Sequence, residues 1–370
     1  MQSVPRAWRW AFGILAAASF LGSCSRPPAT GWKPVPIPTD AEFSGLWFSD
    51  SLHGWIAGSS YAIQGGIAGR TFDGGRTWRF QSGIVPGAAA RAGLHRVQFR
   101  DSLHGWAASD DGLLRTEDGG ENWHSGRAGR GGGPSLFDVQ FLDAQTGWAT
   151  GNGRILATDD GGETWRTLVR SAVENGYLTG NAIYFVDRMH GWLAGRDGIL
   201  MRSADGGLTW TRVALPLGED EHPTLWDLTF SDPLHGWAAG ERGSVFHTED
   251  GGETWALQET GIPAVRVLPK GERPRHDVLP ELETEPDRLT ISALHFIDAL
   301  HGCAVGYYAD VAESVVMRTQ DGGEQWQVEH VQPGEILRAV FVLDGAHAWA
   351  VGDRARTQSQ VLLRYVAAAH

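Results

Sequence analysis

The sequence predicts an all-β protein, a single seven-bladed β-propeller of four-stranded blades whose ring is closed by the N-terminal strand. Three observations predict this fold. One octapeptide recurs six times, a second phrase recurs seven times, and successive copies lie about 45 residues apart. A repeated unit of that length, with room for four short strands, is one blade of a propeller.

The octapeptide reads Ser/Thr-x-Asp-Gly-Gly-x-x-Trp and predicts a tight hairpin turn. The Asp accepts hydrogen bonds from nearby backbone N–H groups, the glycines supply a positive φ, and the Trp begins the returning strand. Copies span residues 71–78, 116–123, 158–165, 203–210, 248–255 and 319–326. A carboxylate repeated in every blade is expected to build the scaffold, and this applies to Asp73, Asp118, Asp160, Asp205, Asp250 and Asp321.

The second phrase is an alternating apolar strand followed by Asp-x-x-His-Gly-Trp-Ala. Its copies span residues 48–55, 99–106, 141–148, 185–192, 230–237, 296–303 and, more divergently, 342–349. The repeated Asp and His invite a metal-site interpretation. However, one pair per blade spreads them around a ring too wide to converge on one ion. We therefore expect turn capping, and no metal ligands are assigned.

Strands can be placed within each unit by their period-two alternation. In the second blade we expect strands at Leu94–Phe99, Gly105–Ser109, Gly112–Thr116 and 122–125. The seventh unit has no octapeptide and ends in residues 360–365, which match the third strand of other blades. Residues 32–36 resemble the segment that follows an octapeptide, so we expect the N-terminal segment to complete the last blade and close the ring.

The N-terminus reads as a targeting segment. Arg6 and Arg9 precede a short apolar run that ends in Leu21-Gly22-Ser23-Cys24, which resembles a bacterial lipobox. This predicts a lipoprotein signal peptide at residues 1–24 with Cys24 as the lipidated residue, a tether at 25–30 and the propeller at 31–370. The alternative is a plain secretory signal cut near Ser23; either predicts an extracytoplasmic protein.

Composition limits the function further. The formal net charge of −13 argues against nucleic-acid binding. The chain has two cysteines, Cys24 and Cys303, and a disulfide between them is not expected. Cys303 occupies the position that is Trp in the other copies of the second phrase, so we expect a small core residue there rather than a reactive thiol.

A basic residue precedes the octapeptide or its equivalent in most blades. One interpretation is an Arg packed between blades and paired with a turn carboxylate; the other is a surface for an anionic partner. The residues are Arg70, Arg115, Arg202, His247, Arg318 and Arg364, with Ala157 as the exception.

Function is expected where the repeat breaks, in the loops opposite the repeated turns. Residues 127–133 are basic and Gly-rich, 218–222 are acidic, and 261–288 form one long insertion, either a partner-binding edge or a disordered loop. Residues 307–310 lengthen the second hairpin of the sixth blade. The candidate partner-binding residues are Arg127, Arg130, Arg273, Arg275, Tyr307 and Tyr308.

The octapeptide resembles the Asp-box, or BNR, repeat of sialidase-like propellers. Sialidases and β-glucan hydrolases of that kind would be carbohydrate-active, but the chain has no Arg-Ile-Pro phrase and no evident pair of catalytic carboxylates. From Trp32 to Tyr365 the chain is more similar to the photosystem II stability/assembly factor family. That resemblance implies a monomeric, non-catalytic, lipid-anchored propeller without cofactor that binds a membrane protein or complex. A glycoside hydrolase is the alternative.

Overall fold

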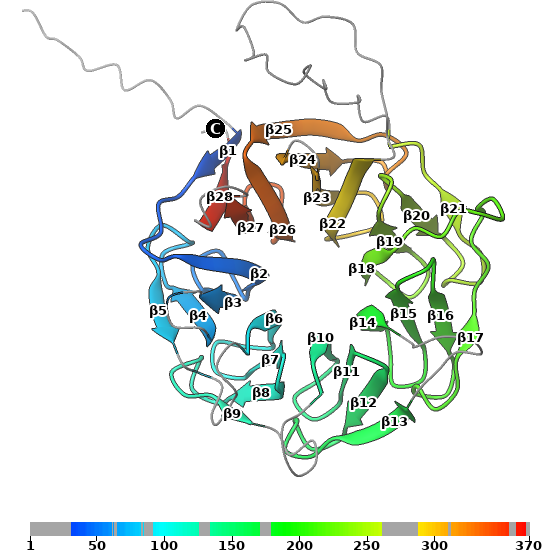
Figure 1. Cartoon of the computed structure of the whole chain (residues 1–370), viewed down its shortest axis with the longest axis horizontal. Coiled ribbons are helices and arrows are strands. Elements are labelled where there is room, and N and C mark those ends of the chain that lie inside the picture. The colour runs from blue at the N-terminus through cyan, green and yellow to red at the C-terminus, as the bar shows by residue number, and fades with distance from the viewer. Residues whose placement is uncertain are drawn as a thin grey trace, which may run out of the picture.

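The computed structural model confirms a seven-bladed propeller of four-stranded antiparallel sheets arranged around a central axis (Figure 1). It describes residues 31–60, 62, 65–82, 84, 92–125, 134–170, 179–260, 288–309, 312–354 and 360–367. Within these residues no helix is long and apolar enough to cross a bilayer. We label the strands of each blade A to D from the axis outward.

Strand A of each blade lies next to the axis (Figure 1). The first four blades comprise β2 (Ala41–Phe48), β3 (Gly54–Ser60), β4 (Gly65–Thr71) and β5 (Arg79–Ser82); β6 (Leu94–Phe99), β7 (Gly105–Ser109), β8 (Gly112–Thr116) and β9 (His124–Ser125); β10 (Leu136–Phe141), β11 (Gly147–Gly151), β12 (Arg154–Thr158) and β13 (Arg166–Arg170); and β14 (Gly180–Phe185), β15 (Gly191–Gly195), β16 (Leu200–Ser203) and β17 (Thr211–Arg212).

The remaining three blades include the lengthened hairpin of the sixth blade and the closing strand of the seventh. They comprise β18 (Leu225–Phe230), β19 (Gly236–Gly240), β20 (Val245–Thr248) and β21 (Ala256–Leu257); β22 (Leu289–Phe296), β23 (Gly302–Tyr308), β24 (Glu313–Thr319) and β25 (Gln327–Pro333); and β26 (Glu335–Val342), β27 (Ala348–Arg354), β28 (Gln360–Val366) and β1 (Gly31–Pro34). The last sheet has the order β1-β28-β27-β26, so the N-terminal strand closes the ring as predicted.

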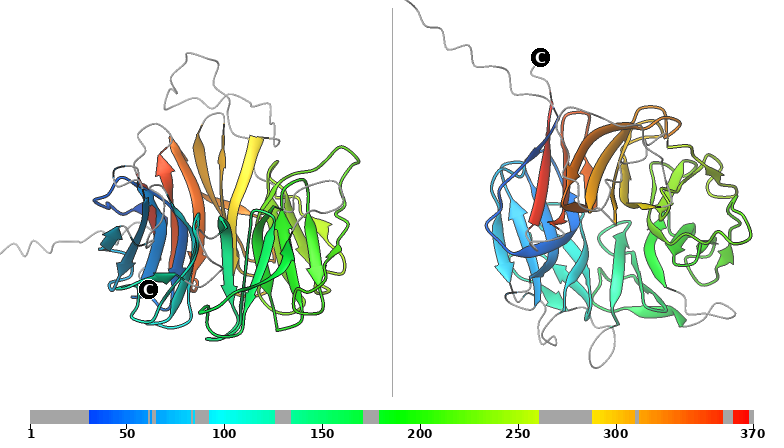
Figure 2. Two further views of the ribbon diagram at one scale, coloured as in Figure 1. Left: turned by 60° about the horizontal axis from the view of Figure 1, so that its bottom comes forward. Right: turned by 45° about the horizontal axis from the view of Figure 1, so that its top comes forward.

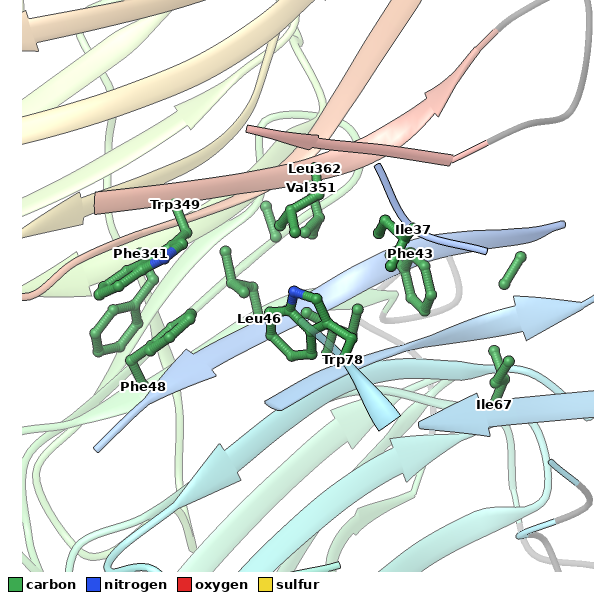
Figure 3. Packing of buried hydrophobic residues seen from close by; sticks show 13 residues of the cluster. Ile37, Phe43, Leu46, Phe48, Ile67, Trp78, Phe341, Trp349, Val351 and Leu362 are labelled. Atoms are coloured by element: carbon green, nitrogen blue, oxygen red, sulfur yellow. The ribbon is translucent and has the colours of Figure 1, made fainter. Parts of the chain in front are cut away.

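Aromatic rings join neighbouring blades. The strand B Trp of one blade stacks on the Phe that ends strand A of the next, for example Trp237 on Phe296 at 3.6 Å between centroids. The Trp Nε1 also donates to a turn glycine carbonyl of that next blade, as Trp349 does to Gly74 across the first and last blades at 2.9 Å. Figure 3 shows this interface, where Trp349 lies against Phe48. Five of the six strand B Trp rings are therefore both buried and oriented by a hydrogen bond, whereas Trp192 stacks on Phe230 but its Nε1 has no partner among the described residues.

The glycine before each of these Trp residues is required by the same packing. A Cβ on Gly236 would lie 2.4 Å from the ring of Phe230, and Gly54 is equally close to Phe48. The His-Gly-Trp spacing is therefore explained by a Phe ring lying flat on the glycine backbone.

Cys303 marks the one interface between consecutive blades that lacks this pairing. The seventh blade has no octapeptide to offer an acceptor carbonyl, and its strand A ends in Val342 instead of Phe. Cys303 is fully buried, and burial raises the pKa of its thiol to about 12. Cys303 lies in the same buried cluster as Trp32 of β1, which confirms the prediction that Cys303 is a small core residue.

Blades 6, 7 and 1 are taller than the others. Their strands A to C have seven or eight residues, whereas those of blades 2 to 5 have four to six. The excess lies on one face, where β22 and its neighbours project beyond the rest of the ring (Figure 2). The lengthened hairpin of the sixth blade is therefore part of a wall that three consecutive blades build.

Candidate functional site

The six octapeptides form C–D turns held by their own side chains. In the fifth blade, Thr248 Oγ1 donates to Asp250 Oδ1 at 2.8 Å and accepts from Gly252 N at 2.9 Å. Thr254 N and Oγ1 donate to the same carboxylate at 2.9 and 2.6 Å. Slight burial acts to raise the pKa of Asp250, but the Thr254 hydrogen bonds outweigh it and lower the pKa to about 2. The carboxylate is therefore ionised and occupied by the turn.

The A–B turns lie beside the octapeptide turns. Gly251 N donates to Leu234 O of the A–B turn in the same blade at 2.9 Å, and the other octapeptides repeat this bond. Within the A–B turn, Asp232 accepts from the backbone N–H groups of Leu234 and His235 and contacts the imidazole of His235. We call the face that carries both sets of turns the turn face, and the opposite one the loop face.

The basic residues before the octapeptides link neighbouring blades. Arg70 pairs with Glu121 of the next blade, and Arg202 pairs with Glu253 in the same way. Arg115 Nη2 lies 3.3 Å from Glu163 Oε1. These three contacts support the interpretation of Arg packed between blades and paired with a turn carboxylate.

A charged cluster crosses the central channel. Arg96 of the second blade binds Asp138 of the third at 3.0 Å and Asp227 of the fifth at 2.5 Å. Each Asp also accepts a backbone N–H from the blade that follows it, Ile183 N at 2.9 Å and Leu294 N at 3.0 Å. Burial acts to lower the pKa of Arg96, but the two carboxylates raise it, so the guanidinium stays charged.

This cluster forms the floor of a cavity of about 370 Å³. The walls come from the penultimate residues of strands A, including the packed rings of Trp47, His295 and Phe341. The exposed side chains of Arg100 and Pro233, both on A–B turns, stand at its rim. The cavity therefore opens on the turn face, the face that the sequence interpretation set aside.

On the loop face, the channel mouth is formed by a β-bulge at one register in all seven strands A. The residue at each bulge is Ser44, His95, Phe137, Asn181, Trp226, Ser292 or Arg338. A bulge re-aims a side chain from its sheet, which suits a binding rim.

The two sides of the mouth differ in the height of their blades and in the side chains they carry. The low side is formed by blades 2 to 5 and the tall side by blades 6, 7 and 1. On the low side, His95 packs edge-on against Phe137, and its Nε2 lies 2.8 Å from Asp110 Oδ1. On the tall side, Arg338 donates to both oxygens of Asp353, at 2.7 and 3.3 Å. Burial acts to lower the pKa of Arg338, but these bonds outweigh it and raise the pKa.

The predicted partner-binding residues are only partly described. Arg127, Arg130, Arg273 and Arg275 lie outside the described residues, as does the predicted lipidation site Cys24. Tyr307 lies near the C-terminal end of β23 and is half-buried. Tyr308 is 5% exposed and packs in the core of the sixth blade, so its ring offers little surface to a partner.

The acidic loop at 218–222 folds partly on itself, because Glu221 Oε2 accepts from Gly218 N at 3.0 Å. In the described part of the chain, no three His, Cys, Asp or Glu side chains gather as metal ligands would. We therefore assign no ion-binding site within the described residues.

The channel residues were missed by the sequence interpretation. Arg96, Asp138 and Asp227 each stand three residues before the Phe that ends strand A. A charged side chain at the same register of an innermost strand was the available signal. Trp226, which belonged to neither repeated phrase, was the corresponding signal for the loop-face mouth.

Sequence comparison places the chain in a family. Residues 25–128 and 133–223, just over half the chain, match the family described as photosynthesis system II assembly factor YCF48. The chain belongs to this family. It is 33% identical over 93 residues to the photosystem II assembly lipoprotein Ycf48 of Synechococcus sp. (strain CC9902), a match covering 25% of this chain and 26% of that protein. The match thus spans about a quarter of that relative.

Solved structures agree on the fold. "YCF48 bound to D1 peptide" has a TM-score of 0.64 at 18% identity and covers 92% of this chain and 98% of its own. YCF48 from Cyanidioschyzon merolae has a TM-score of 0.64 at 19% identity, with coverages of 91% and 98%. The GH74 xyloglucanase from Xanthomonas campestris has a TM-score of 0.53 at 14% identity, with coverages of 88% and 60%. These likenesses show the fold alone.

Proposed function

We propose that the chain is a non-catalytic assembly factor that binds a polypeptide segment of a membrane protein at the loop-face mouth. Family membership supports the role, since relatives are named as photosystem II assembly proteins and one YCF48 is solved with a D1 peptide. We further propose that the protein is extracytoplasmic and monomeric, and is held at the membrane by a lipid on Cys24.

The observation that carries the proposal is the asymmetric mouth. The wall of blades 6, 7 and 1 stands over one side of it, with Tyr307 and Arg338 on that side. Phe137 and Trp226 come from the low blades, and Trp226 Nε1 is buried with no hydrogen-bond partner among the described residues. The aromatic rings suit apolar groups of a peptide, and Arg338, whose charge is already paired with Asp353, would add a further hydrogen bond. The Arg residues predicted at 127, 130, 273 and 275 would add to this surface.

Catalysis has less support. A glycoside hydrolase needs two carboxylates facing the substrate at a defined separation. In the channel, the carboxylates of Asp138 and Asp227 are both taken up by Arg96 and by backbone N–H groups. The likeness to GH74 enzymes is one of fold and gives no reason to assign their activity here.

The test is a crosslinking pulldown from membranes that contain the lipid-anchored chain. One membrane protein should be enriched by the parent chain, and its yield should fall about tenfold with Trp226→Ala or Arg338→Ala. Leu257→Ser, at a 48% exposed residue of the outer strand β21, is the matched control and should keep the yield. Equal capture by all variants would reject the loop-face site. Turnover of β-glucans or sialosides by the purified chain would reject the non-catalytic role.

Membrane attachment is tested separately. Cys24→Ala should move the chain from the membrane fraction to the soluble fraction, because the predicted acyl chains would be its anchor. A chain that stays in the membrane fraction after this change would contradict the lipid anchor while leaving the loop-face proposal intact.

A further inference from the structure

The turn face carries an arrangement that the repeat alone does not need. Each A–B turn follows strand A. Counted from the first residue after that strand, the first and fourth positions of the turn are apolar in several blades. Leu300 is 53% exposed and Ile297 is 39% exposed in the sixth blade, and other fourth-position residues are about half exposed. These are Leu52, Leu103, Met189 and Leu234. An exposed apolar side chain therefore recurs on the turn face in five of the seven blades.

The channel cavity opens at the middle of the turn face. Its walls include the rings of Trp47 and Phe341, 5.1 Å apart, and His295, 4.5 Å from Phe341. Burial lowers the pKa of His295 to about 4, so its imidazole is neutral at neutral pH. Its Nδ1 is buried and has no hydrogen-bond partner among the described residues. A cavity of about 370 Å³ with aromatic side chains on one wall and charged and polar groups on its floor has room for a large side chain.

The charge of the A–B turns favours a cationic partner. Every A–B turn contributes one Asp at its second position, which gives seven carboxylates, and the only Arg or Lys residues in these turns are Arg100 and Arg188. Burial acts to raise the pKa of Asp298, but hydrogen bonds from the N–H groups of His301 and Leu300 outweigh it and lower the pKa. The turn face therefore carries one ionised carboxylate per blade, which makes it complementary to a cationic surface.

We propose that the turn face is a second docking surface, which takes a protein segment with a large apolar side chain between basic residues and receives that side chain in the channel cavity. This surface is separate from the loop-face mouth, because the Arg96 cluster lies between them. The proposal stands whether or not the loop face binds a partner.

The probe is a pool of random short peptides displayed on phage, selected against the immobilised chain from residue 25 onward. Enriched peptides should carry Phe, Trp or Leu between Lys or Arg residues. By fluorescence anisotropy, Leu300→Ser should weaken their binding about tenfold, and Thr229→Trp, which fills the cavity from its wall, should weaken it at least as much. Leu257→Ser on the outer strand and Trp226→Ala at the loop-face mouth should leave affinity within about twofold.

Leu300→Ser changes an exposed residue and is expected to fold, so the test does not depend on the stability of Thr229→Trp. Enriched peptides that are acidic, peptides that bind the turn-face variants as tightly as the parent, or an absence of enrichment would each overturn the proposal. So would a dimer of the chain, seen by sedimentation, that Leu300→Ser abolishes, since a second copy would then be the occupant. Binding to phosphatidylglycerol vesicles that the same change abolishes would assign the surface to a membrane.

Discussion

Ring closure by β1 can be tested at a single side chain. Trp32 is 5% exposed, its Nε1 donates to Glu329 Oε2 at 2.9 Å, and its ring packs edge-on against Tyr365. Trp32→Ala removes this buried ring where the sixth and seventh blades meet. Truncation of a buried Trp to Ala costs about 3–5 kcal/mol, a large part of the roughly 5–15 kcal/mol that folded proteins have.

The assay is thermal unfolding of the chain from residue 25 onward. At roughly 2 °C per kcal/mol for a domain of this size, Trp32→Ala should lower the melting temperature by about 5–10 °C. Amide exchange should also rise along β28, which becomes an edge strand when β1 detaches. The control is Leu257→Ala on the exposed outer strand β21, for which a change within about 0.5 kcal/mol is expected. An unchanged melting temperature and an unchanged β28 exchange rate in Trp32→Ala would refute closure by β1.

Three further predictions concern the turns, the channel and the core. Because the pKa of Asp250 is lowered, its contribution to stability is complete above about pH 4 and is lost as the pH falls towards 2. The melting temperature of Asp250→Asn should therefore fall less steeply with decreasing pH than that of the parent. Arg96→Met leaves Asp138 and Asp227 without their cation and should lower the free energy of unfolding, measured in urea, by about 3–5 kcal/mol. Adding Asp138→Asn and Asp227→Asn to this variant should recover most of the lost free energy. Cys303→Trp should cost about 1–3 kcal/mol by overpacking, and the native Cys303 thiol should not react with a disulfide reagent until the protein unfolds.

The fold followed from the sequence because each repeat is a local structure. The turn around Asp250 is held by residues within a few positions of it, so the octapeptide alone specifies the turn, and counting copies gives the blades. The stacking of Trp237 on Phe296 joins neighbouring units, so it recurs wherever both phrases are complete. The closing strand could be predicted for the same reason, since one unit lacked its fourth strand.

The channel could not be predicted in this way. Arg96 and Asp227 are 131 residues apart, and their contact depends on which strand positions face the axis and on how three blades are spaced around it. Polar side chains in strand A, such as Asp138, read as solvent-facing because the alternation does not distinguish a channel from the outer surface. The wall formed by blades 6, 7 and 1 could not be predicted from the sequence either, because these three neighbouring blades come from both ends of the chain.

The irregular positions of the repeat explain one another. A strand B Trp stacks on a Phe of the next blade and in five of six cases donates to a turn carbonyl there, whereas the seventh blade offers Val342 and no octapeptide. A Trp at position 303 would therefore have neither a ring to stack on nor a carbonyl to bind, which accounts for Cys303. Trp32 packs in the same buried cluster as Cys303, and its Nε1 donates to Glu329 of the sixth blade. Because β1 pairs with β28, this interface can form only after both ends of the ring are present. The interface that lacks the repeated Trp–Phe pair is thus the one that the two ends of the chain build together.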